Sequence, residues 1–398
     1  MSEIIPYGRQ HITQEDIDAV TSALKSDYLT QGPRIASFEV AFAAYVGSDY
    51  AVAVSNGTAG LHLAVMALGL EKDEYVICTP ITFAASANCV EYCGGNVLFA
   101  DIDPQTYLMD LNSAKSLIEA NPDKKIKGII PVDFAGRVVQ LDAFKSLADA
   151  HDLWIIEDAC HAPGGYFIDD NNQQQKAGNG EFANASVFSF HPVKHIATGE
   201  GGMITTNDKA VYERLMTLRT HGISRDVSLF ENSLEIANGG HESTEFPGWY
   251  MEMHDLGYNF RITDIQAALG TTQLAKADIG LARRREIAKL YTEAFSGHTG
   301  IVNCSGITEG HAYHLFVLEV EDRRGLYDFL RANKIFTQIH YIPVHLMPYY
   351  SKKGWKLGDF PKAEKYYSRC ISIPMYPTIT DEQINRVITK IREFYARS

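Results

Sequence analysis

Short apolar runs of strand length alternate with stretches of helical period along the first half of the chain, and this pattern constrains the fold most. Seven such runs lie at residues 51–54, 75–78, 97–100, 127–132, 153–156, 186–190 and 202–205. Helical patterns lie between them, as at 58–68, 83–92, 111–120 and 141–150. Continuous apolar strands separated by helices predict an α/β fold with a mainly parallel sheet covered on both faces. No helical pattern separates the last two runs, so we expect some antiparallel pairing there.

The two ends of the chain differ from this pattern. Thr13 and Asp16 form a capping box before apolar residues at helical spacing, which predicts a helix. From about residue 225 the composition changes, and residues 239–249 predict a long loop that leaves the alternating pattern. Thr263 to Gln266 then predicts the start of a long helix. We therefore expect a large α/β domain over 1–255 and a smaller C-terminal α+β domain over 256–398.

Charge and cysteine content exclude several function classes. The 398 residues include 49 acidic and 36 basic side chains, a formal charge of −13, which argues against a nucleic-acid binder. We see no targeting segment and no apolar run long enough to span a membrane. The six cysteines are sparse, and no His or Cys completes a metal set around Cys89 and Cys93. We expect a cytoplasmic protein with reduced thiols and no metal site.

Three segments carry side chains suited to chemistry. The first is residues 55–60, Ser-Asn-Gly-Thr-Ala-Gly, which follow a strand and open a helix. Backbone amides at such a helix start attract anions, and the Thr58 hydroxyl adds a donor. The segment has neither the P-loop nor the dinucleotide-binding pattern. A plain connection between strand and helix remains the alternative.

The second segment ends an apolar strand with Glu157 and Asp158. Ligands of open α/β sheets gather at the carboxyl ends of strands, so Asp158 is a candidate functional carboxylate. It could be a general acid or base, a metal ligand or the partner of a ring nitrogen, and a structural salt bridge is the alternative. His161, three residues on, is either a site residue or a core histidine.

The third segment places Lys194 between an aromatic run and a glycine-rich run. Lysines held in partly apolar surroundings have a depressed pKa and can bond to aldehydes as nucleophiles. Together the three segments supply what pyridoxal phosphate requires: a lysine for its aldehyde, a carboxylate for its ring nitrogen and a helix start for its phosphate. Phe83 follows a strand at a place suited to stacking on the ring.

At these residues the sequence resembles the DegT/DnrJ/EryC1/StrS aminotransferases of deoxysugar biosynthesis, from Gln10 to Phe394. The resemblance implies a fold-type-I transferase with pyridoxal 5′-phosphate, and Leu256 to Gly270 is a strong family signature. It implies Lys194, Asp158 and His161 as the catalytic residues. The implied cofactor-binding residues are Gly57, Thr58 with the Ala59 amide, Phe83, Asp158, His161, Ser189, Lys194 and Asn259. Asn259, with Arg261 as a further candidate, would act across the interface of a homodimer.

Within the family, the chain is most similar to the enzymes of pseudaminic acid biosynthesis. The resemblance implies transfer from L-glutamate to C4 of a UDP-linked 4-keto-6-deoxy-N-acetylhexosamine, and neither membrane nor nucleic acid as a partner. The candidate substrate residues are Leu29, Thr30, Gln31, Arg219, Arg225, His340, Tyr341 and His345. The segment 132–136, Val-Asp-Phe-Ala-Gly, often differs in relatives acting on other sugars.

Four other functions remain open from the sequence. One is amino transfer to another nucleotide-linked 4-keto sugar, of the UDP-bacillosamine, legionaminic or dTDP-sugar type. A second is a sugar dehydratase with the same cofactor, which Lys194 disfavours because such members carry His there. A third is a non-catalytic sugar-nucleotide sensor, which is expected to lack Lys194 or Asp158. The last is a metal-dependent hydrolase using Asp158, His161 and His191.

Overall fold

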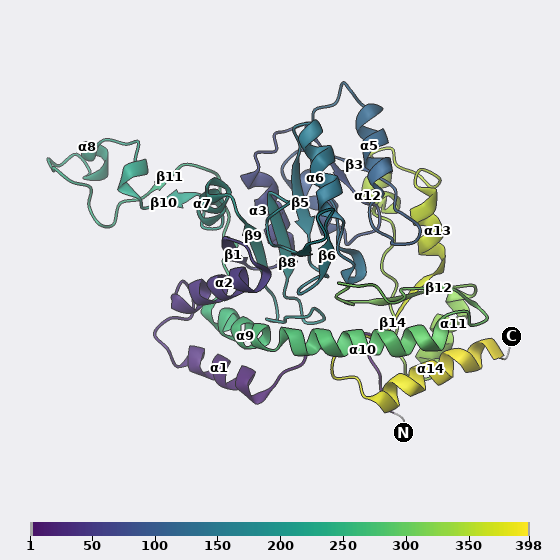
Figure 1. The fold of residues 1–398 in the computed structure, drawn as a ribbon. Coiled ribbons are helices and arrows are strands. Elements are labelled where there is room, and N and C mark those ends of the chain that lie inside the picture. Colours follow the sequence, from purple (N-terminus) through teal and green to yellow (C-terminus); the bar gives the residue numbers. More distant parts are fainter. Residues whose placement is uncertain (1–2, 397–398) are drawn as a thin grey trace.

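A seven-stranded central sheet forms the body of the protein. The computed structural model describes residues 3–396 (Figure 1). The strand order is β1-β9-β8-β5-β4-β2-β3. In that order the strands are Tyr50–Val54, Gly202–Thr206, Ala185–Ser189, Trp154–Asp158, Ile126–Ile130, Tyr75–Cys78 and Asn96–Phe99. The seven apolar runs of the sequence are therefore the seven strands of this sheet.

Strand β9 is antiparallel to both β1 and β8, and the other neighbours pair in parallel. This confirms the mixed pairing expected where no helix separates β8 from β9. Every residue of β5 and β9 is buried, as expected for strands covered on both faces. The helices that alternate with these strands are α3 (Gly57–Ala67), α4 (Ala85–Tyr92), α5 (Leu111–Glu119), α6 (Leu141–Ala150) and α7 (Lys209–Leu218).

Two N-terminal helices and the start of the C-terminal region pack together beside the sheet. Helix α1 (Gln14–Leu24) begins at Thr13, whose amide donates to the Asp16 carboxylate at 2.8 Å, as the capping box predicts. Helices α1 and α2 (Pro33–Val46) contact α9 (Asp264–Ala275). The long helix predicted from Thr263 is divided at Lys276, whose φ and ψ of −113° and 8° separate α9 from α10 (Ala277–Phe295).

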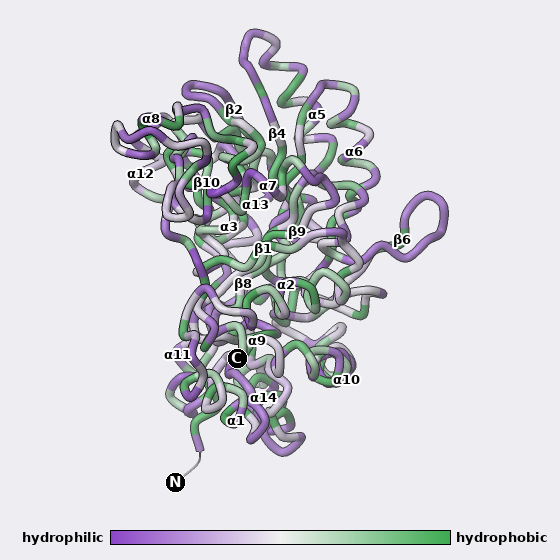
Figure 2. The backbone as a smooth tube through the Cα atoms, turned by 90° about the vertical axis from the view of Figure 1, so that its left-hand side faces the viewer, coloured by the Kyte–Doolittle hydropathy of each residue, from purple (hydrophilic) through white to green (hydrophobic). Residues whose placement is uncertain are grey.

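The C-terminal region carries its own three-stranded antiparallel sheet, in the order β12-β13-β14. Its strands are Ile301–Cys304, Phe316–Val320 and Cys370–Ile373, and its helices are α11 (Arg323–Ala332), α12 (Pro348–Ser351), α13 (Pro361–Arg369) and α14 (Asp381–Ala396). A second hydrophobic cluster runs here from Ile287 to Ile391 and includes Ile5. In Figure 2 the hydrophobic segments follow the strands of the sheets, whereas the loop beyond β6 is hydrophilic. The boundary at residue 256 stays a prediction.

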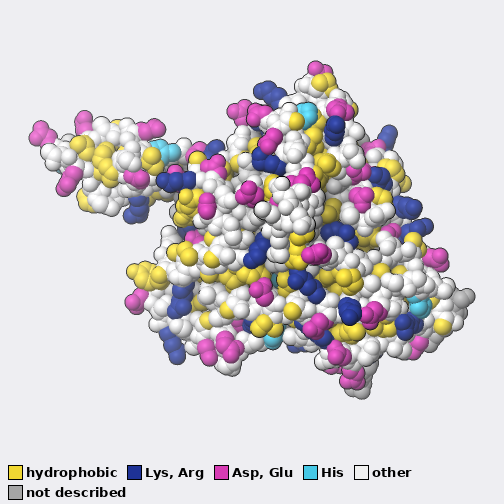
Figure 3. Space-filling model, in the orientation of Figure 1, with side chains coloured by type: hydrophobic (Ala, Val, Ile, Leu, Met, Phe, Trp, Pro, Cys, Tyr) yellow, Lys and Arg dark blue, Asp and Glu magenta, His cyan; other side chains and the backbone are white. Residues whose placement is uncertain are grey.

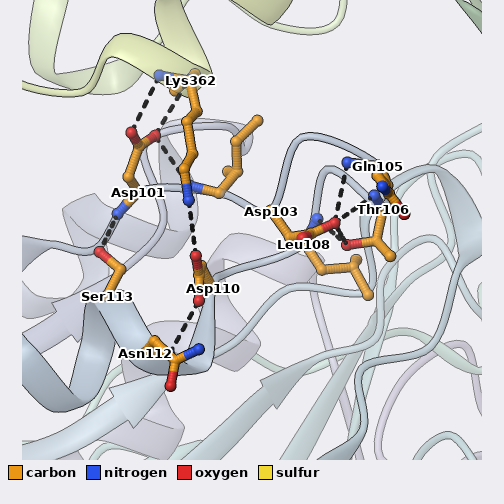
Figure 4. A network of polar contacts seen from close by, with 11 residues as sticks. Asp101, Asp103, Gln105, Thr106, Leu108, Asp110, Asn112, Ser113 and Lys362 are labelled. Atoms are coloured by element: carbon orange, nitrogen blue, oxygen red, sulfur yellow. Dashed lines mark hydrogen bonds and ion pairs between the residues drawn. The ribbon is translucent and has the colours of Figure 1, made fainter.

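Helix α13 is attached to the large sheet by the loop that follows β3. Asp101 accepts hydrogen bonds from the amides of Lys362 and Ala363 at 3.1 and 3.0 Å, and Lys362 Nζ lies 2.8 Å from Asp110 Oδ2 (Figure 4). A carboxylate at a helix N-terminus satisfies amides that have no partner within the helix. These contacts hold α13 against the large sheet.

An arm projects from the body between α7 and α9, where the sequence predicts the long loop. It holds β10 (Ile223–Ser224), α8 (Leu234–Ala237) and β11 (Glu252–Met253), and it stands apart in Figures 1 and 3. A smaller hairpin pairs β6 (Tyr166–Ile168) with β7 (Gln174–Lys176). Short 3₁₀ turns occupy Phe134–Gly136, Val227–Leu229 and Val344–Leu346. Across residues 3–396, no helix has the length and apolar content needed to span a membrane.

Candidate active site

A cavity of about 860 Å³ opens at the carboxyl ends of the parallel strands. Segments that follow β1, β2, β4, β5 and β8 line one side of it, and residues 338–342 of the C-terminal region line the other. Of the predicted residues, it brings together Gly57, Thr58, Ala59, Phe83, Asp158, His161, Ser189, His191, Lys194, His340 and Tyr341. Three segments far apart in the sequence therefore form one site, as expected at the edge of an open α/β sheet.

Asp158 is a buried carboxylate held by neutral donors. The Ser86 hydroxyl donates to its Oδ2 at 2.6 Å, and the Cys160 amide donates to its Oδ1 at 3.2 Å. Thr82 Oγ1 lies 2.7 Å from Ser86 Oγ and supports it. Within residues 3–396 no cationic side chain lies in ion-pair distance of Asp158. A buried anion without a cation favours a positively charged ligand group beside it.

Lys194 lies in the turn that follows β8, where its amide donates to the His191 carbonyl at 2.8 Å. Burial lowers the pKa of its ammonium below the ordinary value, and the charges of Cys160 and Asp158 partly oppose this effect. A lysine with a lowered pKa supplies more of the neutral amine that acts as a nucleophile and base. The direction of this pKa shift is the one that the sequence predicts.

Helix α3 begins at the cavity wall. Asn56 is its N-cap, and the Asn56 side chain accepts the Ala59 amide at 2.8 Å. The cap accepts from the Ala59 amide here, and the use of that amide for phosphate stays a prediction. A Cβ at Gly57 would lie 3.0 Å from Ser189 Cβ and 3.3 Å from Cys160 Sγ, so glycine permits this close approach. Gly57, Thr58 and Ser189 remain the donors for an anion at this helix start.

Aromatic side chains line part of the cavity. Phe83 is 61% exposed, and its ring centroid lies 6.2 Å from that of Tyr341. The Tyr341 hydroxyl lies 3.3 Å from His161 Nε2. His340 is buried and its Nδ1 lies 2.8 Å from Ser372 Oγ, and burial with the nearby Lys194 charge lowers its pKa to about 3.

Two of the predicted substrate residues form their interactions outside the cavity. Arg219 is buried outside the cavity, where its Nη1 lies 2.5 Å from Glu39 Oε1 and donates to the Ala53 carbonyl at 2.7 Å. His345 is fully buried, with its Nε2 3.0 Å from Glu364 Oε1. The prediction that either residue meets a diphosphate in this cavity is wrong, because both are engaged in the interior.

Other predicted residues lie on the surface, away from the cavity of the same chain. Leu29, Thr30 and Gln31 are exposed beside the start of α9, where the Asp264 amide donates to the Leu29 carbonyl. Arg225 is exposed on the arm, close to Met251. Asn259 is exposed and Arg261 partly buried just before α9. None of these six lines the cavity, so a role for any of them there requires a second copy of the chain.

The sequence did not reveal the residues that position Asp158. Ser86 and Thr82 belong to the segment that carries Phe83. No sequence pattern marks a hydroxyl that points toward a strand far away in the chain. Tyr7 and Gln338 also line the cavity. The Met375 amide donates to the Tyr7 carbonyl at 3.0 Å, so the N-terminal segment is tied to the C-terminal sheet. Such long-range contacts cannot be read from local patterns.

Comparison with known proteins assigns the family. Residues 10–392 match the DegT/DnrJ/EryC1/StrS aminotransferase family. The chain belongs to this family. The spore coat polysaccharide biosynthesis protein SpsC of Bacillus subtilis is 37% identical, with 98% of this chain and 97% of that protein covered. PseC of Helicobacter pylori, an aminotransferase of pseudaminic acid biosynthesis, has a TM-score of 0.86 at 27% identity, with both chains fully covered. Spr1654 of Streptococcus pneumoniae, in its pyridoxal phosphate form, has a TM-score of 0.85 at 25% identity, with 99% of each chain covered.

The chain is thus a sugar aminotransferase whose cofactor is pyridoxal 5′-phosphate. The site fits that cofactor, because a buried anion without a cation faces a cavity that also holds a lysine amine and a helix start. When bound, the cofactor supplies an electrophilic carbon and a ring that withdraws electrons. Lys194 would hold it covalently and then move a proton at the substrate carbon. Asp158 would keep the ring nitrogen protonated, and Gly57, Thr58 and Ser189 would bind the phosphate.

Proposed function

We propose that this chain transfers an amino group from L-glutamate to C4 of a UDP-linked 4-keto-6-deoxy-N-acetylhexosamine. The product is UDP-4-amino-4,6-dideoxy-N-acetyl-β-L-altrosamine, the amino sugar of pseudaminic acid biosynthesis. The observation that carries amino transfer is the presence of Lys194 and Asp158 in one cavity. Similarity to PseC over the full chain supports the choice of sugar. We place the reaction in the cytoplasm, where nucleotide sugars are available.

The C-terminal wall of the cavity supports a sugar substrate. His340 and Tyr341, which belong to a segment similar to pseudaminic acid enzymes, line the cavity together with Gln338. Their rings and amide offer both flat surfaces and hydrogen-bond donors, which is what a hexose with an N-acetyl group requires. We propose that these three residues border the sugar.

A second candidate is amino transfer to another nucleotide-linked 4-keto sugar. SpsC, which acts in spore coat polysaccharide biosynthesis, is more similar in sequence at 37% than PseC is at 27%. Relatives acting on sugars of the D-xylo series share the cofactor residues, so Lys194 and Asp158 cannot separate these substrates. The shape of the sugar pocket decides between them.

We also propose a homodimer with shared sites. Asn259 and Arg261 do not line the cavity of their own chain. The arm and its base expose large apolar side chains that a partner would cover; they are Val227, Leu229, Ile236, Trp249, Met251, Met253 and Leu256. A concentration of apolar surface on one projecting segment is typical of an interface.

The test of the substrate is a comparison of two keto-sugar epimers. Both the β-L-arabino and the D-xylo forms of the UDP-linked 4-keto sugar are assayed with L-glutamate, and 2-oxoglutarate is measured. We expect a higher kcat/KM for the β-L-arabino form. A preference for the D-xylo epimer contradicts the proposed sugar but leaves the aminotransferase assignment intact.

A further inference from the structure

The ring nitrogens of His161 have two different partners. The amide of Ala135 donates to Nδ1 at 3.2 Å, and the Tyr341 hydroxyl lies 3.3 Å from Nε2. An N–H donor at Nδ1 requires a lone pair on that nitrogen. The neutral ring must then carry its proton on Nε2 and donate it to the Tyr341 oxygen. The contact with the Ala135 amide therefore favours His161 as the donor in its hydrogen bond with Tyr341.

The surroundings of His161 disfavour its cationic form. The side chain is 5% exposed, and burial lowers the pKa of the imidazole well below its ordinary value, as does the charge of Lys194. The ring of His314, which burial also keeps neutral, lies 4.3 Å away between centroids. A second proton on Nδ1 would also place two donors, that nitrogen and the Ala135 amide, against each other. These surroundings favour the neutral ring.

A constrained loop aims the Ala135 amide at His161. Ala135 has φ of 61° and Gly136 has φ of 98°, so two consecutive residues adopt the left-handed region. The Ala135 carbonyl accepts from the Leu315 amide at 3.1 Å, and the Gly136 carbonyl accepts from the Ala312 amide at 2.7 Å. A Cβ at Gly136 would lie 2.8 Å from the Tyr313 nitrogen and 2.9 Å from the His161 carbonyl oxygen. Residues 132–136 thus reach His161 through the Ala135 backbone amide.

We propose that the Ala135 amide fixes His161 as the tautomer protonated on Nε2, so that His161 is a positioning residue that turns the Tyr341 hydroxyl into a hydrogen-bond donor toward an oxygen atom of the sugar. Since the Tyr341 oxygen accepts from His161, its own proton is free to point elsewhere. Burial raises the pKa of Tyr341 above its ordinary value, so the hydroxyl stays protonated at neutral pH. Tyr341 lines the cavity, and no second hydrogen-bond partner of its hydroxyl occurs within residues 3–396. The sugar as the acceptor rests on the proposed function, whereas the position of the His161 proton does not.

The first test measures that proton directly. The holoenzyme is labelled with ¹⁵N in its histidines, and ring nitrogen shifts are recorded between pH 6 and pH 8, with His161→Gln assigning the His161 signals. We expect an unprotonated Nδ1 and a protonated Nε2 over the whole range. Protonation of Nδ1, or of both nitrogens, at neutral pH overturns the proposal. This result does not depend on which sugar is the substrate.

The second test is a double-mutant cycle on kcat/KM for the keto sugar. Tyr341→Phe and His161→Leu each remove one part of the same hydrogen-bonded unit, so each should lower kcat/KM about tenfold, and the double variant should be no worse. His161→Gln, which keeps a side-chain donor, should recover most of the loss. Tyr349→Phe, at an exposed tyrosine outside the cavity, is the matched control and should leave kcat/KM unchanged. Independent, multiplying effects of the two substitutions would contradict the proposal even if the enzyme remains active.

Discussion

The proposed roles of two residues require opposite charge states. Lys194 acts as a neutral amine, whereas Asp158 acts as an anion. Lys194 must lose its charge to act as an amine, and burial lowers its pKa in that direction. Asp158 must keep its charge to stabilise a protonated ring nitrogen, and the Ser86 hydroxyl and the Cys160 amide donate hydrogen bonds to its two oxygens. The same cavity meets both needs because the two side chains come from different strand ends.

Replacement of Lys194 by alanine should abolish amino transfer while the chain still folds. The amine that moves the proton is removed, and positioned proton transfer contributes about 10²–10⁴-fold to rate, so turnover should fall at least that far. Turnover of glutamate and keto sugar measures this. Lys352→Ala is the control, because Lys352 is exposed and lies outside the cavity. Full activity of Lys194→Ala would refute its catalytic role.

The Asp158→Asn substitution tests the charge of this side chain separately from its shape. The amide keeps an oxygen that can accept from Ser86 but removes the negative charge beside the ring nitrogen. We expect kcat to fall by about 10²–10³-fold, as for loss of one buried electrostatic contact, with an unchanged melting temperature. Near wild-type turnover in this variant would show that another group protonates the ring.

Among the secondary-structure elements, the sequence predicted those helices and strands whose signal is a local periodicity. The seven strands, the helices between them and the capped starts at Thr13 and Thr263 were found because each signal lies within a few residues. The break at Lys276 was missed, since the apolar period continues across it. Arg219 was misassigned because its partner Glu39 is 180 residues away in sequence. A buried ion pair of this kind leaves no trace in local composition.

The Arg219–Glu39 pair joins the end of α7 to α2 and should matter for stability. Both side chains are about one-tenth exposed, and breaking a buried pair leaves an uncompensated charge at a cost of about 3–5 kcal/mol. Arg219→Ala should therefore lower the free energy of unfolding measured with urea by about that amount. An unfolding free energy equal to that of the wild type would contradict this structural role of the pair.

Two buried carboxyl groups join the loop after β4 to strand β5 and should make stability depend on pH. Asp133 and Glu157 are at most 1% exposed, and burial raises the pKa of both. The folded chain therefore keeps a proton that the unfolded chain loses above pH of about 4. Because the unfolded state binds fewer protons, this pair's contribution declines as pH rises towards the raised pKa, by up to about 1.4 kcal/mol per pH unit.

Urea unfolding of the wild type and of Asp133→Asn between pH 5 and pH 8 measures this contribution. The asparagine retains a donor for Glu157 but does not titrate. The difference in unfolding free energy between the two proteins should shift in favour of the variant as pH rises. A difference that does not change with pH would show that the pair holds no extra proton.

The whole molecule has a compact body and a projecting arm that exposes several apolar side chains, which is why we expect two chains to act together (Figure 3). Mixing Lys194→Ala and Asn259→Ala subunits, each inactive alone, tests this. If Asn259 serves the partner's site, mixed dimers contain one intact site and should recover up to about a quarter of wild-type activity at equal mixing. This figure follows from half the dimers being mixed, with one of their two sites intact. No recovery after subunit exchange would place each site within one chain.

The central claim is that one lysine of this cavity carries the cofactor of a sugar aminotransferase. Borohydride reduction of the purified enzyme, followed by peptide mass mapping, tests it most directly because it fixes the bond between lysine and cofactor. We expect a single modified residue, Lys194, and a loss of activity in proportion to its modification. Modification of a different lysine, or an active enzyme that carries no reducible bond to its cofactor, would contradict it.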